Sequence, residues 1–237
     1  MNTEYVFKRS FYYDAEDSAK NNSITFILGA RKCGKTVCMK QLAVNLPNAK
    51  YYDIKSMDED DAIDLRDEIV ACIEANESKI FLIDEATYFI FPEKTIARIA
   101  NEFTDCRNTN TRVVFAGSQS IALEAWANRA FAGNAKFVYA DFLSYPEWLA
   151  YKGIDEVSEK TYNQFVLGTR EFYQDFVSLD QYLKGCLEET VTSNFKTSNI
   201  ILNNNCDRLN EKILKKRRIL KILPMFIWSC AVMTAAR

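Results

Sequence analysis

The chain has 237 residues, of which 48% are hydrophobic and 26% charged. This composition is typical of a globular protein with a sizeable core, and it excludes collagen-like, coiled-coil and disordered classes. The sequence contains no histidine, which excludes histidine-based catalytic triads and histidine zinc sites. A net charge of −2 gives no overall basic field that would attract nucleic acid.

The charged residues are unevenly distributed along the chain. Residues 53–68 carry eight acidic and two basic side chains, and residues 207–221 carry seven basic and two acidic ones. Charge runs are usually solvated faces, so the basic segment 208–221 is only a local candidate for an anionic partner such as nucleic acid.

The seven cysteines form no C-x-x-C pair, and no apolar signal segment begins the chain. We therefore expect reduced thiols and a cytoplasmic location.

Short runs that are apolar throughout alternate with segments of helical periodicity. The expected strands are 24–28, 51–54, 80–83, 112–117 and 137–140. The expected helices are 37–46, 58–75, 92–103 and 121–129. Fully apolar strands that alternate with helices predict an α/β fold of three layers, with a parallel sheet covered by helices on both faces.

This alternation ends near residue 151, and we expect one domain over residues 1–151 and a helical C-terminal region over 152–237. Residues 162–184 and 187–195 have the pattern of helices rich in aromatic side chains. The apolar stretch 222–236 contains Pro224 and is shorter than the roughly 20 residues that a membrane-spanning helix needs. A membrane anchor is therefore disfavoured.

One motif fits a phosphate-binding loop, G-x-x-x-x-G-K-[ST], at every fixed position, and it lies between an expected strand and an expected helix. In such a loop the backbone N–H groups and the positive end of the helix dipole face an anion. Lys35 would reach the β- and γ-phosphates, and the Thr36 hydroxyl would bind Mg²⁺. The alternative is a plain strand-to-helix turn with a capping threonine. The candidate nucleotide-binding residues are Gly29, Ala30, Arg31, Lys32, Cys33, Gly34, Lys35, Thr36 and Val37.

Two acidic residues end the third expected strand. Asp84 is placed to hold Mg²⁺ or its waters, and Glu85 is placed to accept a proton from the water that attacks the γ-phosphate. Acids at such a position also serve as helix caps, which is the alternative for Asp84. The adjacent pair favours hydrolysis over binding alone.

Small polar residues follow the fourth expected strand. Ser118 or Gln119 would hydrogen-bond the γ-phosphate or orient the water, while Ser118 or Ser120 would alternatively cap the next helix. The aromatic residues 11–13 would either stack on adenine or pack in the core.

Five segments together resemble prokaryotic AAA-type ATPases of the STAND-like group. They are the phosphate loop, F-L-I-D-E-A at 81–86, V-V-F-A-G-S at 113–118, Asn128-Arg129, and L-S-Y-P-E-W at 143–148. The resemblance implies a five-stranded parallel sheet in the order 5-1-4-3-2. It also implies a sensor role for Ser118 and a phosphate-responsive role for Arg129, although Asn128 replaces the glycine that usually precedes this arginine.

Members of that family generally continue into a winged-helix region and a further C-terminal domain. This chain ends too early for both, so we expect a shortened or truncated relative.

The leading functional hypothesis is Mg²⁺-dependent ATP hydrolysis coupled to a conformational change in an attached or partner module, with a protein partner at the C-terminal helices. A small-molecule kinase is one alternative, but the arginines that could cover a transferred phosphate, Arg98, Arg107 and Arg112, are dispersed. The other alternative is a nucleotide-gated interaction module with little turnover.

Overall fold

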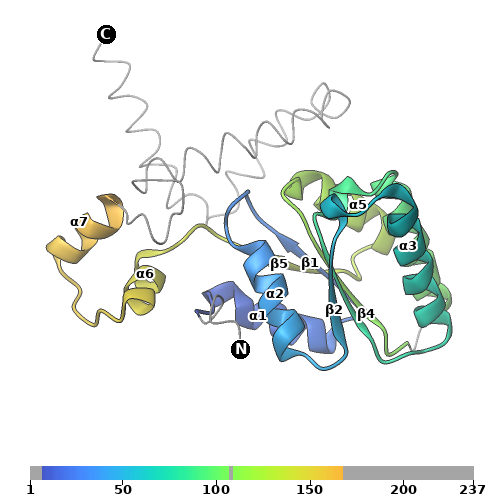
Figure 1. Ribbon diagram of the computed structural model, residues 1–237, viewed down its shortest axis with the longest axis horizontal. Coiled ribbons are helices and arrows are strands. Elements are labelled where there is room, and N and C mark those ends of the chain that lie inside the picture. Colours follow the sequence, from blue (N-terminus) through green and yellow to red (C-terminus); the bar gives the residue numbers. More distant parts are fainter. Residues whose placement is uncertain (1–6, 107–108, 168–237) are drawn as a thin grey trace, which may run out of the picture. The chain divides into compact units, whose positions relative to one another are not determined.

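The computed structural model describes residues 7–106 and 109–167, all within one compact unit, Met1–Asn194 (Figure 1). Helices and strands alternate along most of this part of the chain. The strands are β1 (Ile24–Leu28), β2 (Ala49–Asp53), β3 (Ile80–Asp84), β4 (Arg112–Ala116) and β5 (Lys136–Tyr139). The α-helices are α1 (Ser10–Asn21), α2 (Lys35–Asn45), α3 (Glu59–Glu74), α4 (Pro92–Asp105), α5 (Ser120–Phe131), α6 (Tyr145–Lys152) and α7 (Glu159–Leu167). Two short 3₁₀ helices, η2 (Ile54–Ser56) and η3 (Ala86–Tyr88), follow β2 and β3.

The five strands form one parallel sheet in the order β2-β3-β4-β1-β5. This confirms the predicted fold class and the strand order that the resemblance implied. All five strands lie within two residues of their predicted bounds, because each is a short apolar run between clear turn residues. β1 lies at the centre, with Ile27 opposite Ala116 of β4 and Leu28 opposite Tyr139 of β5.

The strands bury alternate side chains on the two faces of the sheet. Phe26, Phe81 and Phe115 point to the face that α3, α4 and α5 cover, whereas Ile27 and Val114 point to the opposite face. Helices α1 and α2 cover this opposite face (Figure 1). The sheet therefore has a hydrophobic core on each side, as expected for a parallel sheet.

Helix α1 is a feature that the sequence analysis did not predict. Its hydrophobic side consists of Phe11, Tyr12, Ala15 and Ala19, which pack in the core between the sheet and helices α1 and α2. Tyr13 points outward and is 59% exposed. The core-packing alternative is thus confirmed for Phe11 and Tyr12.

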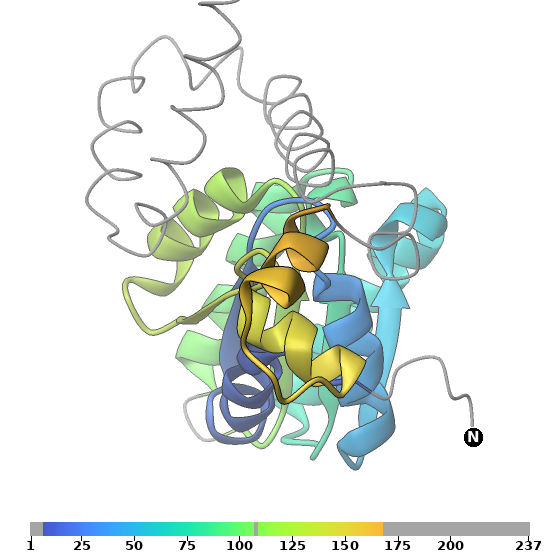
Figure 2. The ribbon, with the colours of Figure 1, turned by 90° about the vertical axis from the view of Figure 1, so that its left-hand side faces the viewer.

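Helices α6 and α7 lie next to each other (Figure 2) and share a small hydrophobic cluster of their own. This cluster contains Leu143, Trp148, Leu149 and Phe165 and is separate from the two cores of the sheet. Helix α6 begins with a capping box, in which Ser144 and Glu147 exchange hydrogen bonds, and is followed by the C-cap residue Gly153, which has a positive φ of 64°. Such a cap stabilises a short helix locally.

Several expectations lie outside the described residues. The helix expected over 162–184 is seen up to Leu167, as part of α7. The helix 187–195, the basic segment 208–221 and the apolar stretch 222–236 are not described. Among the described residues, no helix has the length and hydrophobicity to cross a membrane, and Cys33, Cys38, Cys72 and Cys106 are free thiols.

The packing around Phe26 gives a test of the core. Its ring is fully buried and lies 5.0 Å from the Phe115 ring, between centroids, with Phe131 and Phe137 also in contact. We expect Phe26→Ala to lower the free energy of unfolding by about 3–5 kcal/mol, because it leaves a cavity among aromatic rings. The measurement is chemical denaturation, with Phe91→Ala as a matched control, since the Phe91 side chain is 62% exposed. A similar loss in both variants would contradict this account of the core.

Candidate functional site

The predicted site residues meet at the carboxyl edge of the sheet because of the strand order. Gly29 directly follows β1, Asp84 ends β3 and Ser118 follows β4. β4 lies between β1 and β3, so the three strand ends are neighbours. In open parallel sheets, ligands bind outside the carboxyl ends of the strands.

The loop between β1 and α2 is held by its own lysine. Lys35 is buried, and its ammonium group donates hydrogen bonds to the carbonyl oxygens of Gly29 at 2.9 Å and of Ala30 at 2.6 Å. The Cys33 thiol also donates to the Ala30 carbonyl. Three carbonyl contacts thus curl the loop around the lysine, while Thr36 and Val37 in the first turn of α2 are exposed.

Two glycines are required in this loop for different reasons. Gly34 has a φ of 91°, which side-chain-bearing residues rarely adopt. At Gly29 the restriction is space, since a Cβ atom would lie 2.4 Å from the carbonyl oxygen of Ala140, just after β5. The chain has only seven glycines, and these two lie where other residues would not fit.

Asp84 is buried at the end of β3 and accepts two hydrogen bonds. The Tyr51 hydroxyl donates to Oδ2 at 3.0 Å, and the Glu85 N–H donates to Oδ1 at 3.0 Å. The Thr36 hydroxyl lies near this carboxylate and favours its ionised form. Burial raises the pKa of Asp84, and these hydrogen bonds offset part of that rise. None of these contacts is a helix cap, so the capping alternative for Asp84 is wrong.

Glu85 lies beside Asp84 in a strained backbone conformation, with φ at 51°. Its carboxylate is held by Ser118, whose hydroxyl donates to Oε1 at 2.7 Å and whose N–H donates to Oε2 at 3.3 Å. Ser118 is itself buried. The structure thus joins two predicted site residues from neighbouring strands.

Ser120 connects the first turn of α5 to the phosphate loop. Its hydroxyl accepts from the Gly29 N–H at 2.7 Å and donates to the Gly29 carbonyl at 2.8 Å. The N-cap of α5 is Gln119, and its side chain makes no capping hydrogen bond. The capping alternative for Ser118 and Ser120 is therefore wrong.

The structure does not bring Arg129 to the phosphate loop. It lies nine residues, or roughly 13 Å, along α5 from Ser120. Its side chain is 60% exposed and forms an ion pair with Glu93 at 2.9 Å. Within a single chain, the geometry therefore places Arg129 outside the cluster of the other site residues.

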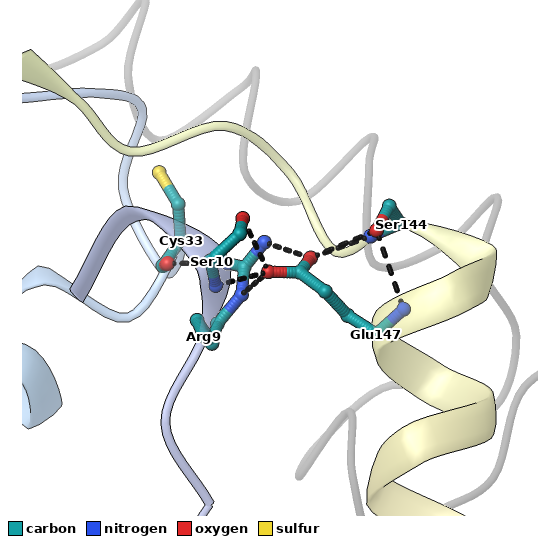
Figure 3. A network of polar contacts seen from close by, with 5 residues as sticks. All are labelled: Arg9, Ser10, Cys33, Ser144 and Glu147. Carbon is teal, nitrogen blue, oxygen red and sulfur yellow. Dashed lines mark hydrogen bonds and ion pairs between the residues drawn. The ribbon is translucent and has the colours of Figure 1, made fainter. Parts of the chain in front are cut away.

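A network of polar contacts joins the loop to α6 (Figure 3). Arg9, just before α1, donates from Nη1 to the carbonyl oxygen of Cys33 at 2.7 Å. The same guanidinium binds the Glu147 carboxylate through Nη2 at 2.8 Å and Nε at 3.3 Å. Glu147 also accepts from the N–H and hydroxyl groups of Ser10 and of Ser144, at 2.9–3.0 Å. Both oxygens of a largely buried carboxylate are thus fully used.

The sequence analysis missed Arg9, Tyr51 and the role of Glu147. The capping-box pattern of Ser144 and Glu147 was a local signal for the start of a helix. No local pattern indicates that Arg9 lies beside Glu147, since 138 residues separate them. Tyr51 lies on β2, whose place beside β3 became known only from the resemblance.

The Arg9–Glu147 contact makes stability depend on pH. Burial would raise the pKa of Glu147, but the hydrogen bonds and charge of Arg9 and the N–H groups of Ser10 and Ser144 outweigh it and lower the pKa to about 2, from an ordinary value of 4.5. The stabilisation is therefore complete above about pH 4.5 and is lost as the pH falls towards 2.

We expect Glu147→Gln to lower the free energy of unfolding at pH 7 by about 3 kcal/mol. The difference from the parent protein should shrink as the pH falls from 4.5 towards 2. Urea denaturation at a series of pH values measures both effects, with Glu59→Gln in the exposed first turn of α3 as the control. A difference between parent and variant that does not change over this pH range would contradict the prediction.

Comparison with known proteins agrees with this geometry. A family model described as "AAA domain" matches residues 21–149, more than half of the chain. No curated protein matches the sequence.

Among solved structures, the chain is similar to the Orc1 protein of Aeropyrum pernix, determined in complex with DNA, at 10% identity and a TM-score of 0.43. That match covers 61% of this chain and 48% of Orc1, so this chain spans about half of that structure. It is also similar to the replication initiator DnaA, determined with AMPPCP and single-stranded DNA, at 12% identity and a TM-score of 0.42. The match to DnaA covers 92% of this chain and 67% of that one. The phosphate-loop fold and the family match together show that the chain belongs to the AAA domain family of P-loop NTPases.

Proposed function

We propose that this protein binds ATP and hydrolyses it in a Mg²⁺-dependent reaction. The observation that carries the proposal is the clustering of Lys35, Thr36, Asp84, Glu85 and Ser118 at the carboxyl ends of three neighbouring strands. These five side chains supply a phosphate-binding cation, a hydroxyl, two carboxylates and a hydrogen-bond donor. That set covers the parts which phosphoryl transfer to water requires.

The phosphates would be bound by the loop 29–36. The Lys35 ammonium is buried next to the loop carbonyls, so it is confined to the place where an anion would meet the N terminus of α2. On binding, we expect Lys35 to exchange the carbonyls of Gly29 and Ala30 for phosphate oxygens. Its charge is better matched by an anion than by two neutral carbonyls.

The residues present also fit Mg²⁺. This ion usually takes one or two protein oxygens together with phosphate oxygens and waters, so it does not need a cage of several carboxylates. The Thr36 hydroxyl and the nearby Asp84 carboxylate would hold it. When bound, Mg²⁺ would neutralise charge that develops on the phosphate oxygens.

Glu85 is the proposed proton acceptor for the attacking water. Ser118 orients its carboxylate with two hydrogen bonds. A carboxylate has about four lone-pair positions, so Glu85 can still accept a hydrogen bond from water. As the water oxygen bonds to the γ-phosphorus and the bond to ADP breaks, the water proton passes to Glu85.

Water is favoured over another acceptor because no arginine cluster covers the site within the described residues. Arg112 lies at the opposite edge of the sheet, where it donates to the carbonyls of Thr109 and Thr111, and Arg98 pairs with Glu102 on α4. Arg107 is not described. A role for Arg129 would require that it act on the site of another subunit, as an arginine supplied in trans.

We further propose that the ATP cycle drives a conformational change, passed to a partner protein through the helical region 152–237. Support for this step comes from α6, which leads into that region and is tied to the phosphate loop by Arg9 and Glu147. The domain limits 1–151 and 152–237 belong to the same proposal.

Two substitutions separate binding from hydrolysis. We expect Glu85→Gln to bind ATP normally but to release phosphate at least about 100-fold more slowly, because the proton acceptor is lost. Lys35→Ala should weaken ATP binding by about 10- to 100-fold, since it removes charge-assisted hydrogen bonds. Mg²⁺-dependent phosphate release and equilibrium binding of ATP measure the two effects.

The matched controls are Glu59→Gln and Lys20→Ala, both on exposed helix surfaces, and both should behave as the parent protein. Hydrolysis at the parent rate by Glu85→Gln would refute the assignment of the base. Tight ATP binding with no turnover in the parent would support the nucleotide-gated module instead. Phosphate transfer to an added acceptor without free phosphate would support the kinase.

A further inference from the structure

Arg9 contacts the phosphate loop from outside the motif, at the carbonyl oxygen of Cys33. We propose that Arg9 is a positioning residue that orients the loop for nucleotide binding, and that Glu147 on α6 holds Arg9 in place for this purpose. The inference rests on the proposed ATP-binding function and adds to it a specific determinant of affinity and a connection to α6.

The contact with Cys33 fixes the direction of one peptide group. Arg9 Nη1 lies 2.7 Å from the Cys33 carbonyl oxygen, and Arg9 Cδ lies 3.7 Å from where a Cβ of Gly34 would be. The C=O and N–H groups of a planar trans peptide point in opposite directions. With its carbonyl bound to Arg9, the Cys33–Gly34 peptide directs the Gly34 N–H away from Arg9. This N–H belongs to the loop that would surround a phosphate, at the residue that precedes α2.

A guanidinium is well suited to this task. A charged donor polarises the carbonyl it binds, and this strengthens the N–H of the same peptide as a donor to an anion. The Arg9 charge is balanced by Glu147, through an ion pair at 2.8 Å between side chains that are 13% and 11% exposed. Arg9 therefore acts mainly by orienting the Cys33–Gly34 peptide and adds little net charge to the loop.

The Glu147 carboxylate is itself held in one position. Ser10 and Ser144 hold its two oxygens with four hydrogen bonds, in addition to those from Arg9. Figure 3 shows the carboxylate between Arg9 and the start of α6, with Cys33 on the far side of the guanidinium. A fork-shaped donor held by a fixed carboxylate is far more rigid than a lone arginine, so less entropy is lost when the loop binds its ligand.

The same chain of contacts links the loop to α6. Helix α6 packs with α7 in a small hydrophobic cluster that is separate from the cores of the sheet. If nucleotide binding favours the loop conformation that Arg9 supports, it must also favour the Arg9–Glu147 contact, because coupling between two equilibria is reciprocal. Nucleotide binding should therefore stabilise the first turn of α6.

The affinity test uses Arg9→Ala, Arg9→Lys and Glu147→Gln in the full-length protein, with a non-hydrolysable ATP analogue and Mg²⁺. We expect Arg9→Ala to raise the Kd about tenfold, the equivalent of one lost charge-assisted hydrogen bond. Its kcat at saturating ATP should stay within about twofold of the parent value, because Arg9 touches neither the reacting phosphate nor the water. The Kd of Arg9→Lys should lie between those of the parent protein and Arg9→Ala, since an ammonium can reach Cys33 but cannot bind Glu147 with two donors.

Glu147→Gln tests whether Glu147 acts through Arg9. It should raise the Kd in the parent background and have no further effect in Arg9→Ala, so the two changes should not add. The control is Arg66→Ala, which breaks an arginine–carboxylate contact to Asp67 on α3 and should leave the Kd unchanged. Unfolding temperatures of all variants ensure that binding is measured on folded protein.

Hydrogen exchange of residues 145–152, with and without the analogue, tests the link to α6. We expect slower exchange on binding in the parent protein, a smaller slowing in Arg9→Lys, and no change on binding in Arg9→Ala. Three results of the affinity test would each overturn the inference: an unchanged Kd in Arg9→Ala and Arg9→Lys, a lower kcat without a change in Kd, or additive effects of Arg9→Ala and Glu147→Gln. Unchanged exchange of α6 in a parent protein that binds the analogue would also overturn it. A parent protein that does not bind the analogue would overturn the proposed function as well.

Discussion

The pairing of β1 with both β4 and β5 is the constraint on which the site depends. A parallel strand in the centre of a sheet must be apolar on both faces, and residues 24–28 meet this requirement. β1 then ends at a fixed place beside the ends of β4 and β5, where Ala140 leaves room only for glycine at position 29. The chain has to turn sharply there, and the turn delivers the N terminus of α2 to the edge of the sheet.

The polar groups at this edge satisfy one another in pairs. Lys35 binds loop carbonyls, Tyr51 binds Asp84, and Ser118 binds Glu85. Buried polar groups need such partners, because an unpaired one costs about 1–3 kcal/mol. Under the proposed function, phosphate oxygens would take the place of the carbonyls at Lys35, and Mg²⁺ would bind at Asp84. The proposed chemistry therefore uses groups that are already oriented.

Much of the sheet could be predicted from the sequence, since each strand is a short apolar run, and the phosphate-loop motif identified where the first strand turns into a helix. Helix α1 was missed because its buried side includes polar and aromatic residues such as Ser18 and Tyr12, which do not form a clear apolar stripe. The Arg9–Glu147 contact was missed because 138 residues separate the two side chains in sequence. Arg129 shows the limit of a motif, since its place along α5 follows from helix length and not from its neighbours in sequence.

The central claim is that the loop 29–36 binds the phosphates of ATP through Lys35. It is tested most directly by a crystal structure of the protein with Mg²⁺ and a non-hydrolysable ATP analogue. The account predicts that the Lys35 ammonium leaves the Gly29 and Ala30 carbonyls and lies within hydrogen-bond distance of the β- and γ-phosphates, with Thr36 and Asp84 at the metal. An analogue bound away from this loop, with Lys35 still on both carbonyls, would contradict it.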